Sequence, residues 1–172
     1  MATNNIVLIG FMGVGKGTTA REMVKNSDYF AVDTDDLIES IENKKIKKIF
    51  KDSGEAYFRM LEKKCAKWCE ENLTNTIIST GGGFYKQENI KKIGKVVYLK
   101  SEFDDIINNL KAAPNAQAKF KKRPLLNDLD EARKLYEVRI KEYEKVADII
   151  VDVSNKDLPK IVAEILEKIK KS

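Results

Sequence analysis

A glycine-rich stretch at residues 10–19, Gly-Phe-Met-Gly-Val-Gly-Lys-Gly-Thr-Thr, constrains the fold of this chain more than any other segment. It follows the apolar run Ile6–Ile9, which predicts a buried strand, and it opens a helical stretch from residue 16 to about residue 25. Glycine reaches positive φ without a Cβ penalty, so such a turn lets several backbone N–H groups converge on a phosphate. Strand, glycine turn, lysine and helix in this order predict a nucleotide phosphate site.

The predicted nucleotide contacts lie in this turn and in the first turn of the helix. Lys16 is expected to bring a positive charge to the β and γ phosphates. Residue 17 is Gly where the pattern G-x-x-x-x-G-K-(Ser/Thr) has a hydroxyl beside Mg²⁺, and Thr18 is better placed for the α-phosphate than for the metal. The predicted contacts are Gly13, Val14, Gly15, Lys16, Gly17 and Thr18. A glycine turn that only caps the helix is the alternative, which the coincidence of all four features disfavours.

The composition is that of one ordinary globular domain. The 172 residues are 42% apolar and 34% charged, which is typical of a soluble protein. No apolar run reaches the ~20 residues that cross a bilayer, and Ile6–Ile9 lacks the flanks of a signal peptide, so we expect a cytoplasmic protein without a membrane partner. We also expect it to be a monomer. The net charge of +5 suits nucleic acid or an anionic substrate pair. The lysines are scattered over the helices, which argues against nucleic acid.

The reactive side chains narrow the chemistry further. The chain has no histidine, so any general base has to be a carboxylate. Cys65 and Cys69 lie four residues apart in an apolar helical stripe without further zinc ligands, which predicts reduced core thiols. Arginine is scarce beside lysine, which makes each arginine a candidate for bidentate binding of a carboxylate or phosphate. The five are Arg21, Arg59, Arg123, Arg133 and Arg139.

Strands and helices are expected to alternate along the chain. Apolar runs predict strands at residues 6–9, 30–32, 76–80, 95–100 and 147–153. Apolar periodicity predicts helices at 16–25, 36–41, 55–72, 103–110, 129–146 and 158–169, with a break at Asp52-Ser53-Gly54. This alternation favours an α/β fold, a three-layer sandwich around a five-stranded parallel sheet. Residues 111–122 have little periodicity and predict a mobile cationic loop, a candidate lid over a triphosphate.

Two carboxylates, Asp33 and Asp35, follow the second predicted strand. Residues two apart on an extended backbone point the same way, and ligands bind at the carboxyl ends of strands in open α/β sheets. The third strand lacks the terminal Asp that often serves Mg²⁺, which makes Asp33 the natural carboxylate for the metal. The alternative, an N-cap for the next helix, does not exclude this role.

Arg59 and a glycine triplet each allow two interpretations. Arg59 has Glu55 and Glu62 at i−4 and i+3, either as surface ion pairs or as carboxylates that hold the guanidinium toward an anionic substrate. Gly81, Gly82 and Gly83 follow the third strand, either as a tight turn or as a place where the main chain closely approaches a polar ligand.

With these residues assembled, the chain resembles the shikimate kinase family, in the nucleoside-monophosphate-kinase-like branch of P-loop proteins. The resemblance rests on six stretches, Gly10-Phe-Met-Gly-Val-Gly-Lys16, Asp33-Thr-Asp35, Gly54-Glu-Ala-Tyr-Phe-Arg59, Ser79-Thr-Gly-Gly-Gly83, Arg123-Pro-Leu-Leu126 and Arg139-Ile-Lys-Glu-Tyr143. It implies a P-loop NTPase fold in a single domain of residues 1–172, with a substrate-binding helical region at about 34–62 and a lid at about 111–125.

The resemblance also implies a reaction and a role for each residue. The γ-phosphate of ATP would move to the 3-hydroxyl of shikimate, with Mg²⁺ as cofactor, on the route to chorismate. The catalytic residues would be Lys16, Asp35 and Arg123, of which Lys16 and Arg123 follow the γ-phosphate. The substrate-binding residues would be Asp35, Arg59, Gly81, Gly82, Gly83 and Arg139. Asp33 would hold Mg²⁺ through water, together with phosphates, because Gly17 leaves the family's metal position without a hydroxyl.

Two other functions stay open at this point. Gly-Lys-Gly-Thr also occurs in adenylate kinases, and AMP-dependent against shikimate-dependent consumption of ATP would separate the two kinases. A catalytically silent nucleotide-binding module is the second alternative. The joint presence of Asp35, Arg59, Arg123 and Arg139 argues against it, because a silent module needs no clamp for a substrate carboxylate.

Overall fold

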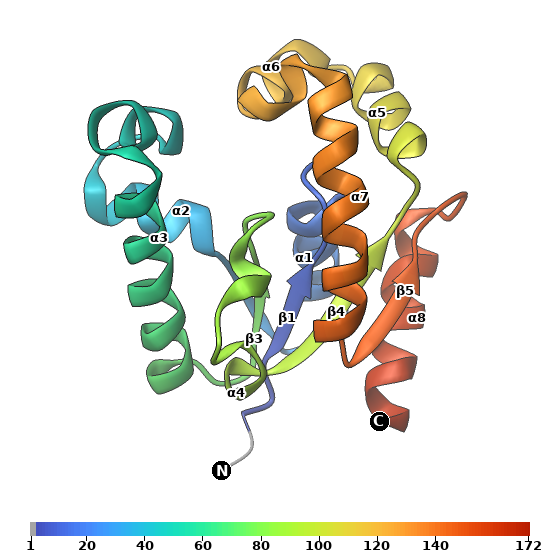
Figure 1. Ribbon diagram of the computed structural model, residues 1–172. Helices are drawn as coiled ribbons and strands as arrows, with labels where there is room; N and C mark the ends of the chain where they lie inside the picture. Colours follow the sequence, from blue (N-terminus) through green and yellow to red (C-terminus); the bar gives the residue numbers. More distant parts are fainter. Residues whose placement is uncertain (1–2) are drawn as a thin grey trace.

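A computed structural model describes residues 3–172 of the chain (Figure 1). Its centre is a parallel sheet with strand order β2-β3-β1-β4-β5. The strands are β1 (Ile6–Ile9), β2 (Phe30–Asp33), β3 (Thr76–Ser79), β4 (Lys95–Lys100) and β5 (Ile149–Asp152). The predicted five-stranded parallel sheet is therefore confirmed, and only the last strand is clearly shorter than predicted.

Helices cover both faces of the sheet and produce the predicted three layers (Figure 1). They are α1 (Lys16–Lys25), α2 (Thr34–Glu42), α3 (Ile46–Asn72), α4 (Ile90–Ile93), α5 (Phe103–Ala112), α6 (Ala116–Lys121), α7 (Leu129–Val146) and α8 (Leu158–Lys171), with short 3-10 turns η1 (Phe84–Lys86) and η2 (Pro124–Asn127). Strand β1 is buried along its whole length because it contributes to both cores. Val7 and Ile9 pack with α3, α5 and α7 on one face, whereas Ile6 and Leu8 pack with α1 and α8 on the other.

Three segments differ from the prediction. Residues 111–122 are not a continuous loop, because α5 runs to Ala112 and α6 occupies Ala116–Lys121. The sequence Ala-Gln-Ala-Lys-Phe-Lys is rich in helix formers, but only Phe120 packs against the core, so no apolar period marks the helix. Turn η1 and helix α4 were also not predicted. The expected break before residue 55 is present as a kink in α3, where Gly54 has φ 83° and ψ 172°.

The carboxyl ends of the strands determine where a ligand can bind. Strand β1 is followed by the glycine turn and α1, β2 by α2, and β3 by the glycine triplet and η1. Because β2, β3 and β1 are parallel neighbours, these three connections meet at one edge of the sheet. Within residues 3–172, no helix combines the length and the apolar character needed to cross a membrane.

Candidate active site

The glycine turn after β1 forms an anion-binding loop. Gly13 and Gly15 have φ of 87° and 102°, which are values that glycine adopts without strain. A Cβ on Gly13 would also lie 2.7 Å from a methyl carbon of Leu110. Gly15 is the N-cap of α1, and no side chain caps the helix there. The first N–H groups of α1 are thus left for a phosphate, where the helix dipole favours negative charge.

Lys16 is buried in this loop, with 8% of its surface exposed. Its Nζ donates to the carbonyl oxygens of Gly10, at 2.7 Å, and Phe11, at 3.1 Å. Burial lowers the pKa of Lys16 to about 8. A phosphate in the loop would offset the lost hydration and stabilise the ammonium form.

The groups that act electrostatically on Lys16 come from three other parts of the chain. Asp33 and Asp35 raise the pKa of Lys16, and Arg123 and Arg139 lower it, although burial has the largest effect. The phosphate loop, the end of β2, the segment before η2 and helix α7 therefore lie close enough together for their charges to interact. Arg123 donates from Nη1 to the carbonyl oxygen of Lys119 at 2.8 Å, and burial lowers its pKa.

Asp33 caps helix α2. Its Oδ1 accepts hydrogen bonds from the backbone N–H of Asp35 at 2.9 Å and of Asp36 at 3.2 Å. Within residues 3–172, Oδ2 of Asp33 accepts no hydrogen bond, so capping leaves one carboxylate oxygen for another ligand. The cap interpretation is correct, and it is compatible with a metal role.

Asp35 is the most perturbed carboxyl group of the cleft. Its Oδ1 is buried and has no hydrogen-bond partner in the described part of the chain. Burial raises the pKa of Asp35 to about 7, Asp33 and Glu62 add to the increase, and Lys16 opposes it. A carboxyl group with an unused oxygen and a pKa near neutrality is suited to accept a proton from a substrate hydroxyl.

The glycine triplet contacts all three predicted substrate-binding side chains. A Cβ would lie 2.7 Å from Oδ1 of Asp35 at Gly81, 2.9 Å from Nη1 of Arg139 at Gly82, and 2.8 Å from Nη1 of Arg59 at Gly83. None of the three glycines has positive φ. A methyl group at any of the three positions would therefore force the end of the neighbouring polar side chain to move. The triplet thus packs directly against the three charged groups.

Arg59 is held by two carboxylates. Its Nη1 donates to Oε2 of Glu62 at 2.6 Å, and its Nη2 donates to Oε1 of Glu55 at 3.2 Å. Glu62 is 1% exposed, and burial raises its pKa while Arg59 and Arg139 oppose that shift. The contact between Arg59 and Glu62 is therefore no exposed ion pair. Glu62 contacts Arg59 directly, as the helical spacing suggests, whereas Arg139 acts on Glu62 only through its charge.

Arg139 is buried on α7, at 7% exposure, and its Nε has no partner among the described residues. One turn further on, Tyr143 donates from its hydroxyl to the carbonyl oxygen of Gly82 at 2.7 Å. Sequence reasoning missed this tyrosine as a functional residue. Its place in the stretch Arg139-Ile-Lys-Glu-Tyr143 was the only indication of a link to the site.

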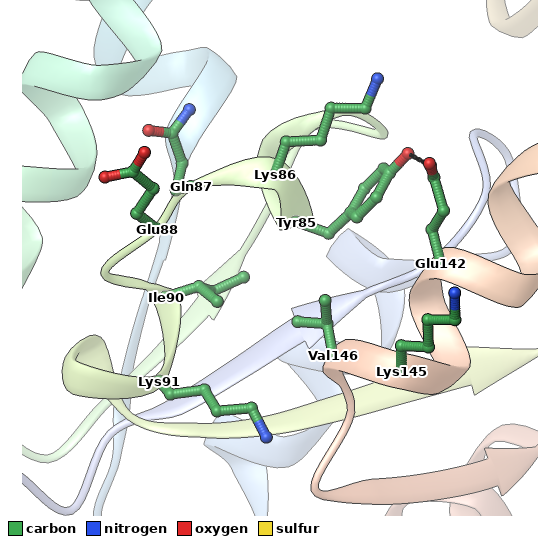
Figure 2. A pocket seen from close by; sticks show the side chains of 9 residues that line it. All are labelled: Tyr85, Lys86, Gln87, Glu88, Ile90, Lys91, Glu142, Lys145 and Val146. Atoms are coloured by element: carbon green, nitrogen blue, oxygen red, sulfur yellow. Dashed lines mark hydrogen bonds between the residues drawn. The ribbon is translucent and has the colours of Figure 1, made fainter.

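Tyr85 and Glu142 support the same contact from outside the cleft. Figure 2 shows both residues in a groove between η1 and the end of α7, where the hydroxyl of Tyr85 donates to Glu142. The ring of Tyr85 packs edge to face on Tyr143, with centroids 4.6 Å apart. Tyr85 thus packs on Tyr143 from the side of this groove, and it was not predicted from sequence.

The surroundings of Gly17 were also not predictable from sequence. A Cβ on Gly17 would lie 3.4 Å from Nη1 of Arg21 and 3.9 Å from Oγ of Ser79. Ser79 is the last residue of β3 and the register partner of Asp33 on β2. Hydroxyl and carboxylate oxygens are hard donors of the kind that Mg²⁺ prefers, so this corner of the cleft fits the metal of a metal-nucleotide complex.

The structure has a phosphate loop between the first strand and the first helix, in a parallel sheet of order β2-β3-β1-β4-β5. A carboxylate and two arginines lie around the glycine triplet at the same sheet edge. These features define a P-loop kinase that acts on a small acidic molecule. The family model for shikimate kinase matches residues 12–170. The chain belongs to the shikimate kinase family. It is accordingly an ATP-dependent transferase, and the resemblance seen in the sequence is confirmed.

Individual relatives extend over nearly the whole chain. A shikimate kinase of Helicobacter hepaticus is 36% identical over 166 residues, which are 95% of this chain and 96% of the relative. One of Clostridium botulinum is 41% identical over 159 residues, which are 89% and 90% of the two chains. Among solved structures, shikimate kinase from Acinetobacter baumannii in complex with shikimate has a TM-score of 0.86 at 27% identity, over 98% of this chain and 94% of that one. The enzyme from Aquifex aeolicus has a TM-score of 0.78 at 35% identity, over 96% of each chain.

Proposed function

We propose that this single cleft binds ATP and shikimate side by side and transfers the γ-phosphate to the 3-hydroxyl, giving shikimate 3-phosphate and ADP. Shikimate phosphorylation with ATP is the activity of the family, on the route to aromatic amino acids. The observation that carries the proposal for this chain is the contact of the glycine triplet with Asp35, Arg59 and Arg139. Three polar side chains from three elements meet there, beside the phosphate loop.

On the substrate side, Arg59 and Arg139 are proposed to hold the carboxylate of shikimate. The guanidinium of Arg59 is fixed by Glu62, and Arg139 is buried with an unpaired Nε, so both arginines lose little freedom when they bind an anion. Asp35 is proposed to orient and deprotonate the hydroxyl through its unpaired Oδ1. Gly81, Gly82 and Gly83 leave room for the ring to approach the main chain.

On the nucleotide side, Lys16 and Arg123 are proposed to follow the γ-phosphate. Phosphoryl transfer needs alignment and neutralisation of the charge that spreads over the equatorial oxygens, and the buried Lys16 and the half-buried Arg123 would supply this. Lys16 exchanges its bonds to Gly10 and Phe11 for phosphate oxygens. The remaining loop contacts are proposed to be Gly13, Val14, Gly15, Gly17 and Thr18.

Mg²⁺ is the proposed metal, and it would neutralise the phosphates when bound. Asp33 is proposed to hold it through water, because its Oδ2 accepts no hydrogen bond within the described residues. Residues 34–62 are proposed as the substrate-binding region, and about 111–125, with α6 and Arg123, as the lid that excludes water. We further propose that the protein is a single domain, a monomer and cytoplasmic, and that it has no nucleic-acid or membrane partner. The free thiols of Cys65 and Cys69 fit a reducing compartment.

A coupled assay of ADP release, with ATP and Mg²⁺ plus either shikimate or AMP, tests the proposal. We expect turnover that depends on shikimate and is absent with AMP. ATP binding measured by calorimetry on the same sample separates the silent-module alternative. Binding of ATP without any shikimate turnover would contradict the proposed function.

A further inference from the structure

We propose that Ser79 supplies the magnesium-side hydroxyl that Gly17 lacks in the phosphate loop. The proposal concerns the metal of the proposed function and rests on it. The sequence by itself left the metal to Asp33, water and phosphates, because the usual position carries no side chain. In the folded protein, a hydroxyl from another strand lies beside that position.

The geometry places Ser79 at the metal corner of the cleft. It is the last residue of β3, and its register partner on β2 is Asp33. Side chains of register partners in neighbouring strands lie on the same face of a sheet. The Oγ of Ser79 lies 3.9 Å from where a Cβ on Gly17 would be, within reach of the space that a serine hydroxyl at position 17 would occupy.

The hydroxyl of Ser79 is also the one that the fold leaves unused. Ser79 is 3% exposed, yet its Oγ makes no hydrogen bond within residues 3–172. Nearby hydroxyls are occupied, since Thr80 donates to the carbonyl oxygen of Leu8 at 2.8 Å and Thr34 accepts from the N–H of Gly81 at 3.2 Å. The Oγ itself is not fully enclosed, because Asp35 Oδ1 and Arg139 Nε are the buried side-chain atoms without a partner within residues 3–172, so this hydroxyl is accessible to a ligand or to water.

The two oxygen groups lie at different places from those common in phosphate-loop proteins. Phosphate-loop proteins commonly place the hydroxyl after the loop lysine and the acid at the end of the neighbouring strand. Here the acid, Asp33, ends β2, and the hydroxyl, Ser79, ends β3. Thr18 is a poorer candidate for the hydroxyl, because its Oγ1 already accepts from Nη2 of Arg21 at 3.3 Å.

Arg21 defines the competing explanation. Its Nη1 would lie 3.4 Å from a Cβ at position 17, so its guanidinium could take over the charge of the metal. In that case the nucleotide would bind equally well with and without Mg²⁺. The two explanations thus differ in the ratio of the affinity for MgADP to the affinity for metal-free ADP.

The test is calorimetric titration of the whole protein with ADP, once with excess Mg²⁺ and once with EDTA. The affinity ratio reports the coupling of metal and nucleotide on the protein without any turnover. We expect Ser79→Ala to lower the ratio about 10-fold, the size typical for removal of a group that supports a bound metal. Gly17→Ser alone should change the affinity ratio less than about threefold, because a hydroxyl is already present. In the Ser79→Ala background, Gly17→Ser should restore the wild-type ratio.

Thr76→Val serves as the matched control. Thr76 is a buried hydroxyl at the other end of the same strand, bonded to the carbonyl oxygen of Thr74 at 2.9 Å, so its loss affects stability and leaves the metal corner intact. The proposal is overturned if Ser79→Ala keeps the wild-type ratio, or if Gly17→Ser fails to restore it in the double variant. A wild-type ratio of one would favour Arg21 instead. Shikimate turnover, assayed separately, decides the proposed reaction independently of these ratios.

Discussion

The hydroxyl of Tyr143 donates a hydrogen bond of 2.7 Å to the carbonyl oxygen of Gly82, and this bond attaches helix α7 to the glycine triplet. Arg139 lies on the same helix, with its Nη1 2.9 Å from the Cβ position of the same glycine. The positions of Arg139, Asp35 and Arg59, the proposed substrate-binding groups, are therefore linked by contacts with one short turn.

Removal of that bond should weaken shikimate binding selectively. We expect Tyr143→Phe to raise the KM for shikimate about 3-fold to 10-fold and to leave the KM for ATP within about twofold, because Arg139 loses its fixed relation to the turn. Tyr136→Phe is the matched control, since Tyr136 is a buried tyrosine of the same helix that donates to the carbonyl oxygen of Ser101 at 2.9 Å. Both variants should lose about 1 kcal/mol in the free energy of unfolding. Equal KM values in the two variants would contradict the positioning role of Tyr143.

A methyl group on Gly82 should act on the same contact from the other side. Gly82 does not have positive φ, so Gly82→Ala meets no backbone penalty and only the collision with the guanidinium of Arg139. We expect the KM for shikimate to rise at least about 10-fold, because a displacement of about 1 Å in a binding group can cost two orders of magnitude. Steady-state kinetics with each substrate varied in turn measures this, and an equal rise for ATP would count against it.

Arg139 should be more sensitive to substitution than another arginine of α7. Lysine cannot replace the two parallel bonds of a guanidinium to a carboxylate, so Arg139→Lys should raise the KM for shikimate about 10-fold or more, and far more than the KM for ATP. Arg133→Lys is the control, because Arg133 pairs with Asp104 on the surface. If Arg139→Lys behaves like Arg133→Lys, the proposed carboxylate clamp is wrong.

The activity should depend on pH through Asp35 and Lys16. Burial raises the pKa of Asp35 to about 7, so the proposed base is protonated and inactive below that value, and kcat/KM should fall toward acid. Burial lowers the pKa of Lys16 to about 8, so kcat/KM should fall again above that value as the ammonium is lost. A pH profile of kcat/KM for the free enzyme tests both limbs, and a flat profile between pH 5 and 7 would exclude Asp35 as the base.

The same shift predicts a change in stability. The folded protein binds the proton of Asp35 more tightly than the unfolded chain, whose ordinary pKa is 3.8, so the carboxyl group makes folding less favourable as pH rises from about 4 to about 7. Asp35→Asn should abolish most turnover and yet raise the Tm at pH 8, with little gain at pH 4. Thermal unfolding at the two pH values measures this. A lower Tm at pH 8 would show that the carboxylate is stabilised by contacts rather than destabilised by burial.

The sequence by itself determined the sheet, the phosphate loop and the family. The run Ile6–Ile9, the glycines before Lys16 and the alternation of strands with helices are local patterns, and each is specified by residues that are adjacent or a few positions apart. The six stretches that resemble shikimate kinases belong to the same category. Helix α6 was not predicted, because a short helix with a single residue packed on the core, Phe120, shows no apolar periodicity.

Only the tertiary structure decided which side chains meet. Gly82 lies beside Arg139 and Tyr143, and Gly17 lies beside Ser79, across separations in sequence that no local pattern encodes. Burial was likewise decided by packing, and it moves the pKa of Asp35 and of Lys16 toward neutrality, because the loss of hydration depends on everything that surrounds the group. The residue types were present in the sequence, but their mutual distances and their solvent exposure exist only once the chain has folded.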